Sequence, residues 1–164
     1  MDLAQFNTAD GAELRGELLA CCDVPAWADA VLAGRPYGDL SELGTTADRA
    51  SRDLGRADVD RALAAHPRIG ERARGSDAGA AWSRGEQSGV SQDEATRAAL
   101  LEGNRAYEDR FGRVFLICAT GLSADQVLAA LHRQLEHDDA TEQDVVADEL
   151  RKIARLRLRK VVDR

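Results

Sequence analysis

The sequence predicts an all-α fold: a single-domain bundle of seven or eight helices that ends in a long C-terminal helix. Helix-capping patterns recur along the whole chain, whereas strand-like alternation never lasts long enough to build a sheet. The 164 residues, of which 44% are hydrophobic and 31% charged, suit one globular domain over residues 1–164, with no internal repeat or flexible linker.

Four helices are expected in the first half of the chain, over about residues 10–22, 25–34, 40–54 and 56–65. Asp10 supplies a side-chain cap for the first of them, and Pro25 is a favoured residue in the opening turn of the second. Pro67 disfavours helical geometry at the residue before it. His66 is therefore expected at the exit of the fourth helix.

The second half begins with an irregular stretch. Residues 67–90 hold five glycines and few large apolar side chains, which predicts a loop with a short helix around residues 79–83. Ser91, Ser123 and Thr141 each begin a capping-box pattern and start the later helices. The first of these is closed by Gly112, and the other two are expected to be about 14 and about 20 residues long.

Charge and composition exclude several classes of partner. The net charge of −7, with 29 acidic and 22 basic residues, opposes binding to nucleic acid. No apolar run is long enough for a membrane span, the N-terminus lacks the pattern of a signal peptide, and three cysteines form no disulfide framework. We therefore expect a soluble, cytoplasmic protein that binds neither nucleic acid nor membrane.

Arg157 is expected on the apolar face of the C-terminal helix. The stripe on that face consists of Val146, Leu150, Ile153, Ala154 and Val161. Arg157 falls near the middle of the stripe, and the other cations of the segment do not; these are Arg151, Lys152, Arg155, Arg159 and Lys160. A guanidinium that faces a core needs an anion, either a buried carboxylate of the protein or a carboxylate of a ligand. Composition alone favours the internal ion pair.

Two further stretches carry candidate chemistry. His66 lies beside the exposed carbonyls of a helix end, which favour the imidazolium form and suit a general acid, although such a histidine more often only caps its helix. Ser83, Glu86 and Gln87 place a hydroxyl, a carboxylate and a carboxamide in a short glycine-bordered loop. This set can bind the amide edges of a small polar ligand, or it can be a helix-capping box.

No metal or organic cofactor is expected. His132 and His137 are about 140° apart on a helix and cannot share a metal ion, and the cysteines lack the spacing of zinc ligands. No phosphate loop, dinucleotide fingerprint or nucleophile elbow is present. Cys118, within an apolar run, is expected to be a buried small hydrophobic residue rather than a nucleophile.

Taken in order, these elements resemble the 2-oxo-4-hydroxy-4-carboxy-5-ureidoimidazoline (OHCU) decarboxylase family over nearly the whole chain. The matching elements are Phe6-Asn7, Cys21-Cys22, Trp27-Ala28, Arg35-Pro36-Tyr37, His66-Pro67-Arg68-Ile69-Gly70, Ser83-x-x-Glu86-Gln87, Asn104-x-x-Tyr107-x-x-x-Phe111-Gly112, Phe115-Leu116-Ile117-Cys118-Ala119 and Glu149-Leu150-x-Lys152-Ile153-x-x-Leu156-Arg157-Leu158. The histidine-proline, Ser-x-x-Glu-Gln and Phe-Leu-Ile-Cys-Ala elements in this order are together quite specific.

The resemblance implies a cofactor-free carboxy-lyase that converts OHCU to (S)-allantoin in the last step of urate degradation, and a homodimer. It implies that His66, Glu86 and Arg157 are catalytic. It also implies a binding wall for the substrate made of Pro67, Ser83, Gln87, Phe115, Leu116, Ile117, Cys118 and Ala119.

Some features depart from the family pattern. The chain does not end in a peroxisomal Ser-Lys-Leu signal, which with the Ala- and Arg-rich composition suggests a bacterial, cytoplasmic member. Thr120 stands where some relatives have arginine. Two alternatives stay open: a helical interaction module that docks an acidic partner through Arg151, Arg155 and Arg159, and a decarboxylase or hydrolase of a related ureido or hydantoin acid.

Overall fold

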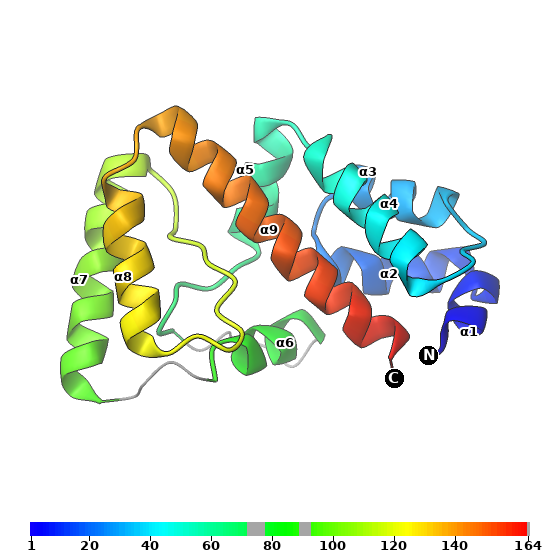
Figure 1. The fold of residues 1–164 in the computed structure, drawn as a ribbon, viewed down its shortest axis with the longest axis horizontal. Coiled ribbons are helices and arrows are strands. Elements are labelled where there is room, and N and C mark those ends of the chain that lie inside the picture. Colours follow the sequence, from blue (N-terminus) through cyan, green and yellow to red (C-terminus); the bar gives the residue numbers. More distant parts are fainter. Residues whose placement is uncertain (72–77, 89–92, 164) are drawn as a thin grey trace. The chain divides into compact units, whose positions relative to one another are not determined.

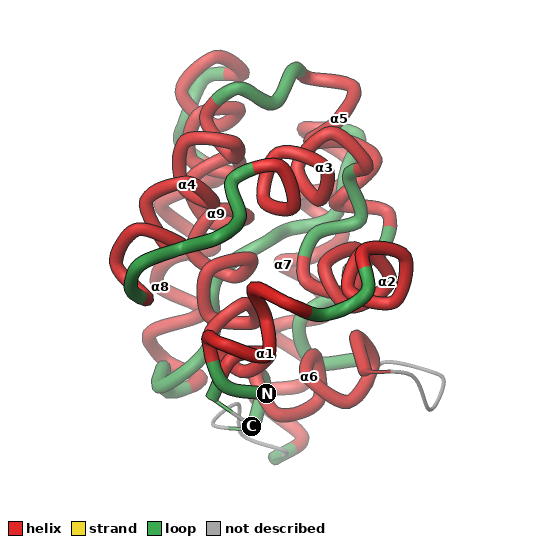
Figure 2. The backbone as a smooth tube through the Cα atoms, turned by 90° about the vertical axis from the view of Figure 1, so that its right-hand side faces the viewer, coloured by secondary structure: helices red, strands yellow, loops and turns green. Residues whose placement is uncertain are grey.

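The computed structural model describes residues 1–71, 78–88 and 93–163, and within these residues it contains nine helices and no strand (Figures 1 and 2). The helices are α1 (Leu3–Thr8), α2 (Gly11–Cys21), α3 (Pro25–Ala33), α4 (Leu40–Arg52), α5 (Arg56–Ala64), α6 (Ala78–Glu86), α7 (Glu94–Phe111), α8 (Ala124–Leu135) and α9 (Asp139–Val162). The all-α class and the long C-terminal helix are confirmed. None of the described helices is long and apolar enough to cross a membrane.

Most of the expected helix ends are confirmed. The Asp10 carboxylate accepts hydrogen bonds from the backbone N–H groups of Ala12 and Glu13, and Ser123 forms a capping box with Gln126. Gly112 closes α7 in the left-handed conformation, with φ of 67°. Sequence periodicity and capping chemistry therefore place these boundaries correctly.

Three helix starts differ from the expectation. Helix α1 was not expected; it has only six residues and is capped by Asp2. Ser91 lies outside the described residues, and α7 is capped instead by Asp93. Helix α9 begins at Asp139, two residues before Thr141, where the capping box was expected, because the Asp138 carboxylate accepts a hydrogen bond from the Thr141 N–H and caps the helix there.

The described chain divides into two compact units. Unit 1 comprises residues 1–62 and 150–164, and unit 2 comprises residues 63–149. The boundaries fall within α5 and within α9. The expectation of one domain over residues 1–164 stays a prediction.

In unit 1, α3 packs against both α2 and α4. The Trp27 side chain is fully buried, and its indole N–H donates hydrogen bonds to the Ala47 carbonyl and the Ser51 hydroxyl of α4. Asn7 exchanges two hydrogen bonds of 2.9 Å with the backbone of Tyr37. The Trp27 and Asn7 side chains therefore have hydrogen-bond partners far away in sequence, as burial of polar groups requires.

In unit 2, α7 packs alongside α8 (Figure 1). Gly103 permits a close approach, because a Cβ atom there would overlap the Leu131 side chain of α8. The core of this unit is formed by residues of α7, of α8 and of the segment before α8; its buried members are Ile69, Leu100, Tyr107, Phe115, Ile117, Ala119, Ala124, Val127, Ala130 and Leu131. Ile69 joins the segment after His66 to this core.

A buried carboxylate joins α7 to the first turn of α9. Glu142 is 0% exposed, and it accepts a hydrogen bond from the Tyr107 hydroxyl. The second oxygen of Glu142 lies 2.8 Å from Nδ1 of His137. Burial, together with the neighbouring carboxylate, raises the pKa of Tyr107, so this phenol remains a hydrogen-bond donor at neutral pH.

Candidate functional site

His66 lies two residues beyond the end of α5, as expected. Its backbone N–H donates a hydrogen bond of 2.9 Å to the Leu63 carbonyl, and the His66 and Pro67 side chains are partly buried. The imidazole is thus carried by a turn that follows a helix rather than by the helix itself. Partial exposure leaves such a group open to a ligand.

Three contacts fix the segment 68–70 that follows. Arg68 makes a two-pronged ion pair with Glu108 of α7, with N–O distances of 2.5 and 2.6 Å. The Asn104 side-chain amide, also on α7, donates a hydrogen bond of 2.9 Å to the Ile69 carbonyl. The Gly70 N–H donates to the side-chain oxygen of Gln87, also at 2.9 Å. We call these three contacts the loop clamp.

Gly70 is required by the geometry of the clamp. Its φ of 90° is unfavourable for residues with a side chain. A Cβ atom there would also lie 3.4 Å from the Leu100 side chain. The backbone must turn sharply at Gly70 for its N–H to reach the side chain of Gln87.

Ser83 and Glu86 occupy a helix, not the glycine-bordered loop that we expected. The short helix expected at 79–83 extends over α6, Ala78–Glu86, because the run Ala78-Gly-Ala-Ala-Trp82 contains three alanines that favour helix and no proline. Three residues apart on a helix, the two side chains share a face, and both are buried, at 5% and 8% exposed. Gln87 follows directly and holds Gly70.

The segment 115–119 lies outside the helices and is mostly buried. Phe115, Ile117 and Ala119 pack into the core of unit 2, and Leu116 is also buried. Cys118 is only partly buried, contrary to the expectation of a buried small residue. The Cys118 N–H donates a hydrogen bond of 2.7 Å to Glu149.

Arg157 is buried in unit 1, at 4% exposed, as the helical wheel predicts. One of its terminal nitrogens donates a hydrogen bond of 3.3 Å to the Ala20 carbonyl of α2. Burial raises the pKa of the nearby Cys22 thiol to about 12, although the charge of Arg157 acts in the opposite direction. Cys22 is therefore a neutral thiol at physiological pH and a poor nucleophile.

The structure joins two of the three candidate stretches. The Gly70–Gln87 hydrogen bond links the segment that carries His66 to the end of α6, where Glu86 lies. Arg157 belongs to unit 1, whereas His66 and Glu86 belong to unit 2. The convergence of the three side chains stays a prediction. A cavity of about 660 Å³ lies beside the loop clamp, between residues 69–71 and the first two turns of α7.

A sequence model of the family described as OHCU decarboxylase matches residues 7–159. The chain belongs to the OHCU decarboxylase family. Among named members of this family, the chain is 32% identical over 137 residues to the OHCU decarboxylase of Haloferax volcanii, covering 82% of this chain and 79% of the relative. It is 30% identical over 168 residues to that of Amia calva, covering 99% and 95%.

A solved structure agrees with this assignment. The crystal structure of an OHCU decarboxylase in the presence of (S)-allantoin superposes with a TM-score of 0.77 at 27% identity, covering 90% of this chain and 98% of that one. The fold of this chain is thus the fold of the OHCU decarboxylase family over nearly its whole length.

Sequence reasoning missed the residues that hold the candidate site of this OHCU decarboxylase family member in place. Asn104 and Glu108 were not singled out as supports, although both lie on the face of α7 that also bears Leu100 and Tyr107. Their partners are 35 and 40 residues away in sequence, so no local pattern could have paired them. Glu149, which binds the Cys118 N–H, was noted only as part of a motif.

The Arg68–Glu108 ion pair gives a pH-dependent prediction. The hydrogen bonds from Arg68, together with its charge, lower the pKa of the Glu108 carboxyl group. A lowered pKa in the folded state means that the stabilisation is present above the carboxyl group's ordinary pKa and is lost as the pH falls through the folded-state value. Glu108→Gln should therefore lower the melting temperature by about 2 °C at pH 7, and this difference should shrink as the pH falls below the ordinary pKa of a carboxyl group.

Thermal unfolding followed by circular dichroism between pH 3 and pH 7 measures this difference. Glu102→Gln is the matched control, because Glu102 is exposed on the same helix. The role given to this ion pair is contradicted if both substitutions lower the melting temperature equally at pH 7. It is also contradicted if the lowering caused by Glu108→Gln is unchanged at pH 3.

Proposed function

We propose that this protein catalyses the decarboxylation of OHCU to (S)-allantoin, the last step of urate degradation. The observation that carries the proposal is the family match over residues 7–159. The hydrogen bond that links the His66 segment to the end of α6 supports it, because general acid catalysis requires a positioned histidine close to groups that can bind the substrate.

His66 is the general acid in this proposal. The bond between the hydroxyl-bearing ring carbon and the carboxylate breaks, carbon dioxide leaves, and the electron pair forms an enol double bond to the neighbouring, ureido-bearing carbon, with the negative charge on the ring nitrogen. The imidazolium of His66 then donates a proton to one face of the ureido-bearing carbon, which fixes the configuration of the product, while the hydroxyl proton passes to the ring nitrogen and the hydroxyl carbon becomes the carbonyl of allantoin. A proton from water restores the imidazolium for the next turnover.

The other candidate residues orient the substrate. Arg157 binds the substrate carboxylate through a bidentate ion pair and orients the scissile bond relative to the electron-withdrawing ring. Glu86 accepts a hydrogen bond from the substrate hydroxyl or amide and favours the charged form of His66. Ser83, Gln87, Pro67 and the backbone of residues 115–119 form the binding wall. No metal or organic cofactor takes part, and the protein acts as a homodimer in the cytoplasm.

The alternative of a basic interaction module has less support. Arg151 and Arg155 both pair with Asp48 of α4, and Arg157 is buried, so much of the basic cluster is already engaged within unit 1. A docking surface for an acidic partner needs solvated, uncommitted charges.

A chiroptical assay tests the proposed function. Urate is oxidised enzymatically to generate OHCU in the cuvette, and the circular dichroism of allantoin is followed after addition of the purified protein. We expect a rapid rise in signal with the sign of the (S) enantiomer. A signal no greater than that of the spontaneous, racemic reaction would rule the proposal out.

A further inference from the structure

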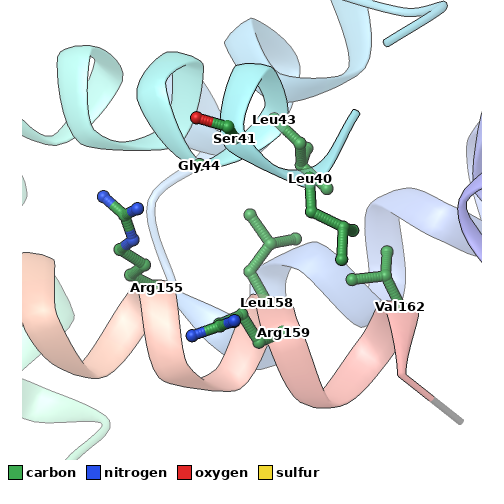
Figure 3. Close-up of a pocket in the computed structure, with 8 residues that line it drawn as sticks. All are labelled: Leu40, Ser41, Leu43, Gly44, Arg155, Leu158, Arg159 and Val162. Carbon is green, nitrogen blue, oxygen red and sulfur yellow. The ribbon is translucent and has the colours of Figure 1, made fainter. Parts of the chain in front are cut away.

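A second cavity lies in unit 1, and the residues that line it include none of those assigned to the reaction, although Arg157 is on α9, one of the helices that line it. It has a volume of about 220 Å³ and opens between residues 40–44 of α4 and residues 155–162 of α9 (Figure 3). Both segments belong to the same unit, so the cavity is defined by the packing of that unit alone.

The cavity has an apolar end and a cationic end. Leu40 and Val162 face one another at the apolar end, Leu158 projects into the middle, and the guanidinium groups of Arg155 and Arg159 lie toward the other end (Figure 3). Leu40 is 40% exposed, and it is one of two large hydrophobic side chains that are exposed among the described residues. Exposed apolar surface of this kind beside charges commonly marks a binding site.

The charged residues that line the cavity are all positive. Its lining contains two arginines and no acidic residue, in a chain whose net charge is −7. Arg155 is paired with Asp48, which also faces Arg151 at 3.4 Å. Gly44 lets the Arg155 guanidinium lie against α4, since a Cβ atom there would come within 3.2 Å of it. Arg155 and Arg151 thus both lie against the Asp48 carboxylate.

Arg159 is the second arginine of the lining. Its side chain is exposed, and within the described part of the chain no carboxylate forms an ion pair with it. Ser41 contributes an exposed hydroxyl to the same lining, and Figure 3 shows this oxygen on the side of the cavity where Arg155 lies. The Arg159 guanidinium suits a carboxylate, which accepts hydrogen bonds only.

We infer that this cavity binds a small aliphatic monocarboxylate. The carboxylate pairs with Arg159, and the hydrocarbon chain passes Leu158 toward Leu40 and Val162. Residues 155–162 span about 10 Å of helix at about 1.5 Å per residue, which is close to the length of an extended eight-carbon chain. Octanoate is therefore the probe of choice.

Isothermal titration calorimetry of the purified full chain with octanoate tests the inference. We expect one octanoate site per chain and affinity at least tenfold weaker for 1-octanol and for octylamine, because these lack the carboxylate. Butanoate should bind several-fold more weakly than octanoate, since it buries less apolar surface. Equal binding of octanoate and 1-octanol would overturn the cationic half of the inference.

Two pairs of variants locate the site. Arg159→Gln should weaken octanoate binding about tenfold, whereas Arg133→Gln, an equal change of charge at an exposed position of α8, should not change it. Leu40→Ser should weaken binding several-fold, whereas Leu101→Ser, at the other exposed leucine, should not. All four positions are exposed, so circular dichroism should show an unchanged fold.

Other outcomes overturn the inference. If octanoate does not bind, or if Arg159→Gln and Arg133→Gln weaken it equally, the cavity is not a carboxylate site. If octanoate does not bind and Leu40→Ser instead lowers the mass measured by light scattering, the apolar end is covered by a second copy of the chain. Binding is measured without the reaction, so failure here leaves the proposed function intact.

Discussion

His66→Ala abolishes the enantioselective formation of (S)-allantoin, and only the racemic product of the spontaneous reaction remains. We expect this result because the positioned imidazolium is the proposed proton donor, and water delivers protons to both faces of the ring carbon. General acid catalysis of this kind typically contributes 10²–10⁴-fold to a rate. The enantiomeric excess is measured by circular dichroism on enzymatically generated OHCU.

The control for this experiment is His132→Ala, which removes an exposed histidine of α8. Both variants should keep the wild-type melting temperature within about 2 °C, since neither histidine is fully buried. His66→Gln, which retains hydrogen bonding but cannot deliver a proton, should be as inactive as His66→Ala. Retention of enantioselectivity by either His66 variant would show that another group protonates the product.

Arg157→Lys is expected to lower kcat/KM by at least about thirtyfold, mainly through a higher KM. Lysine keeps the positive charge, but it cannot make the two parallel hydrogen bonds that a guanidinium makes with a carboxylate. Loss of a charge-assisted pair in a buried position typically costs about 2–5 kcal/mol of binding free energy, which corresponds to a factor of this size. Steady-state kinetics on OHCU measures the effect.

Arg151→Lys is the matched control on the same helix, because Lys can still pair with Asp48. It should leave kcat/KM within about twofold of the wild type. If the two substitutions reduce activity equally, or if Arg157→Lys lowers only the melting temperature, then Arg157 is a structural residue that satisfies the Ala20 carbonyl and its other neighbours. That outcome would favour the internal ion pair that composition alone suggests.

The helices could be predicted where a local side chain decides the boundary. Asp10, Ser123 and Gly112 act on backbone groups within a few residues of themselves, so their effect can be inferred from the sequence. The start of α9 could not be decided in this way, because Asp138 and Thr141 are both good caps and lie three residues apart. The hydrogen bond from the Thr141 N–H to Asp138 settles the choice.

The candidate site was only partly predictable for a related reason. The stripe on α9 that identified Arg157 also contains Glu142, four residues before Val146, and this signal for a buried carboxylate was overlooked. The partners of Glu142 could not have been deduced, since Tyr107 lies 35 residues away. In α6, glycine content suggested a loop, but the alanines around Gly79 were enough to extend a helix through Glu86.

The hydrogen bond from Gly70 limits how the carboxamide of Gln87 can bind a ligand. Its oxygen accepts the Gly70 N–H, so the main chain sets the orientation of the amide plane and the direction of the two amino hydrogens. A group that meets these amino hydrogens must present an oxygen or an unprotonated nitrogen. A urea carbonyl satisfies that demand, whereas an ammonium group does not.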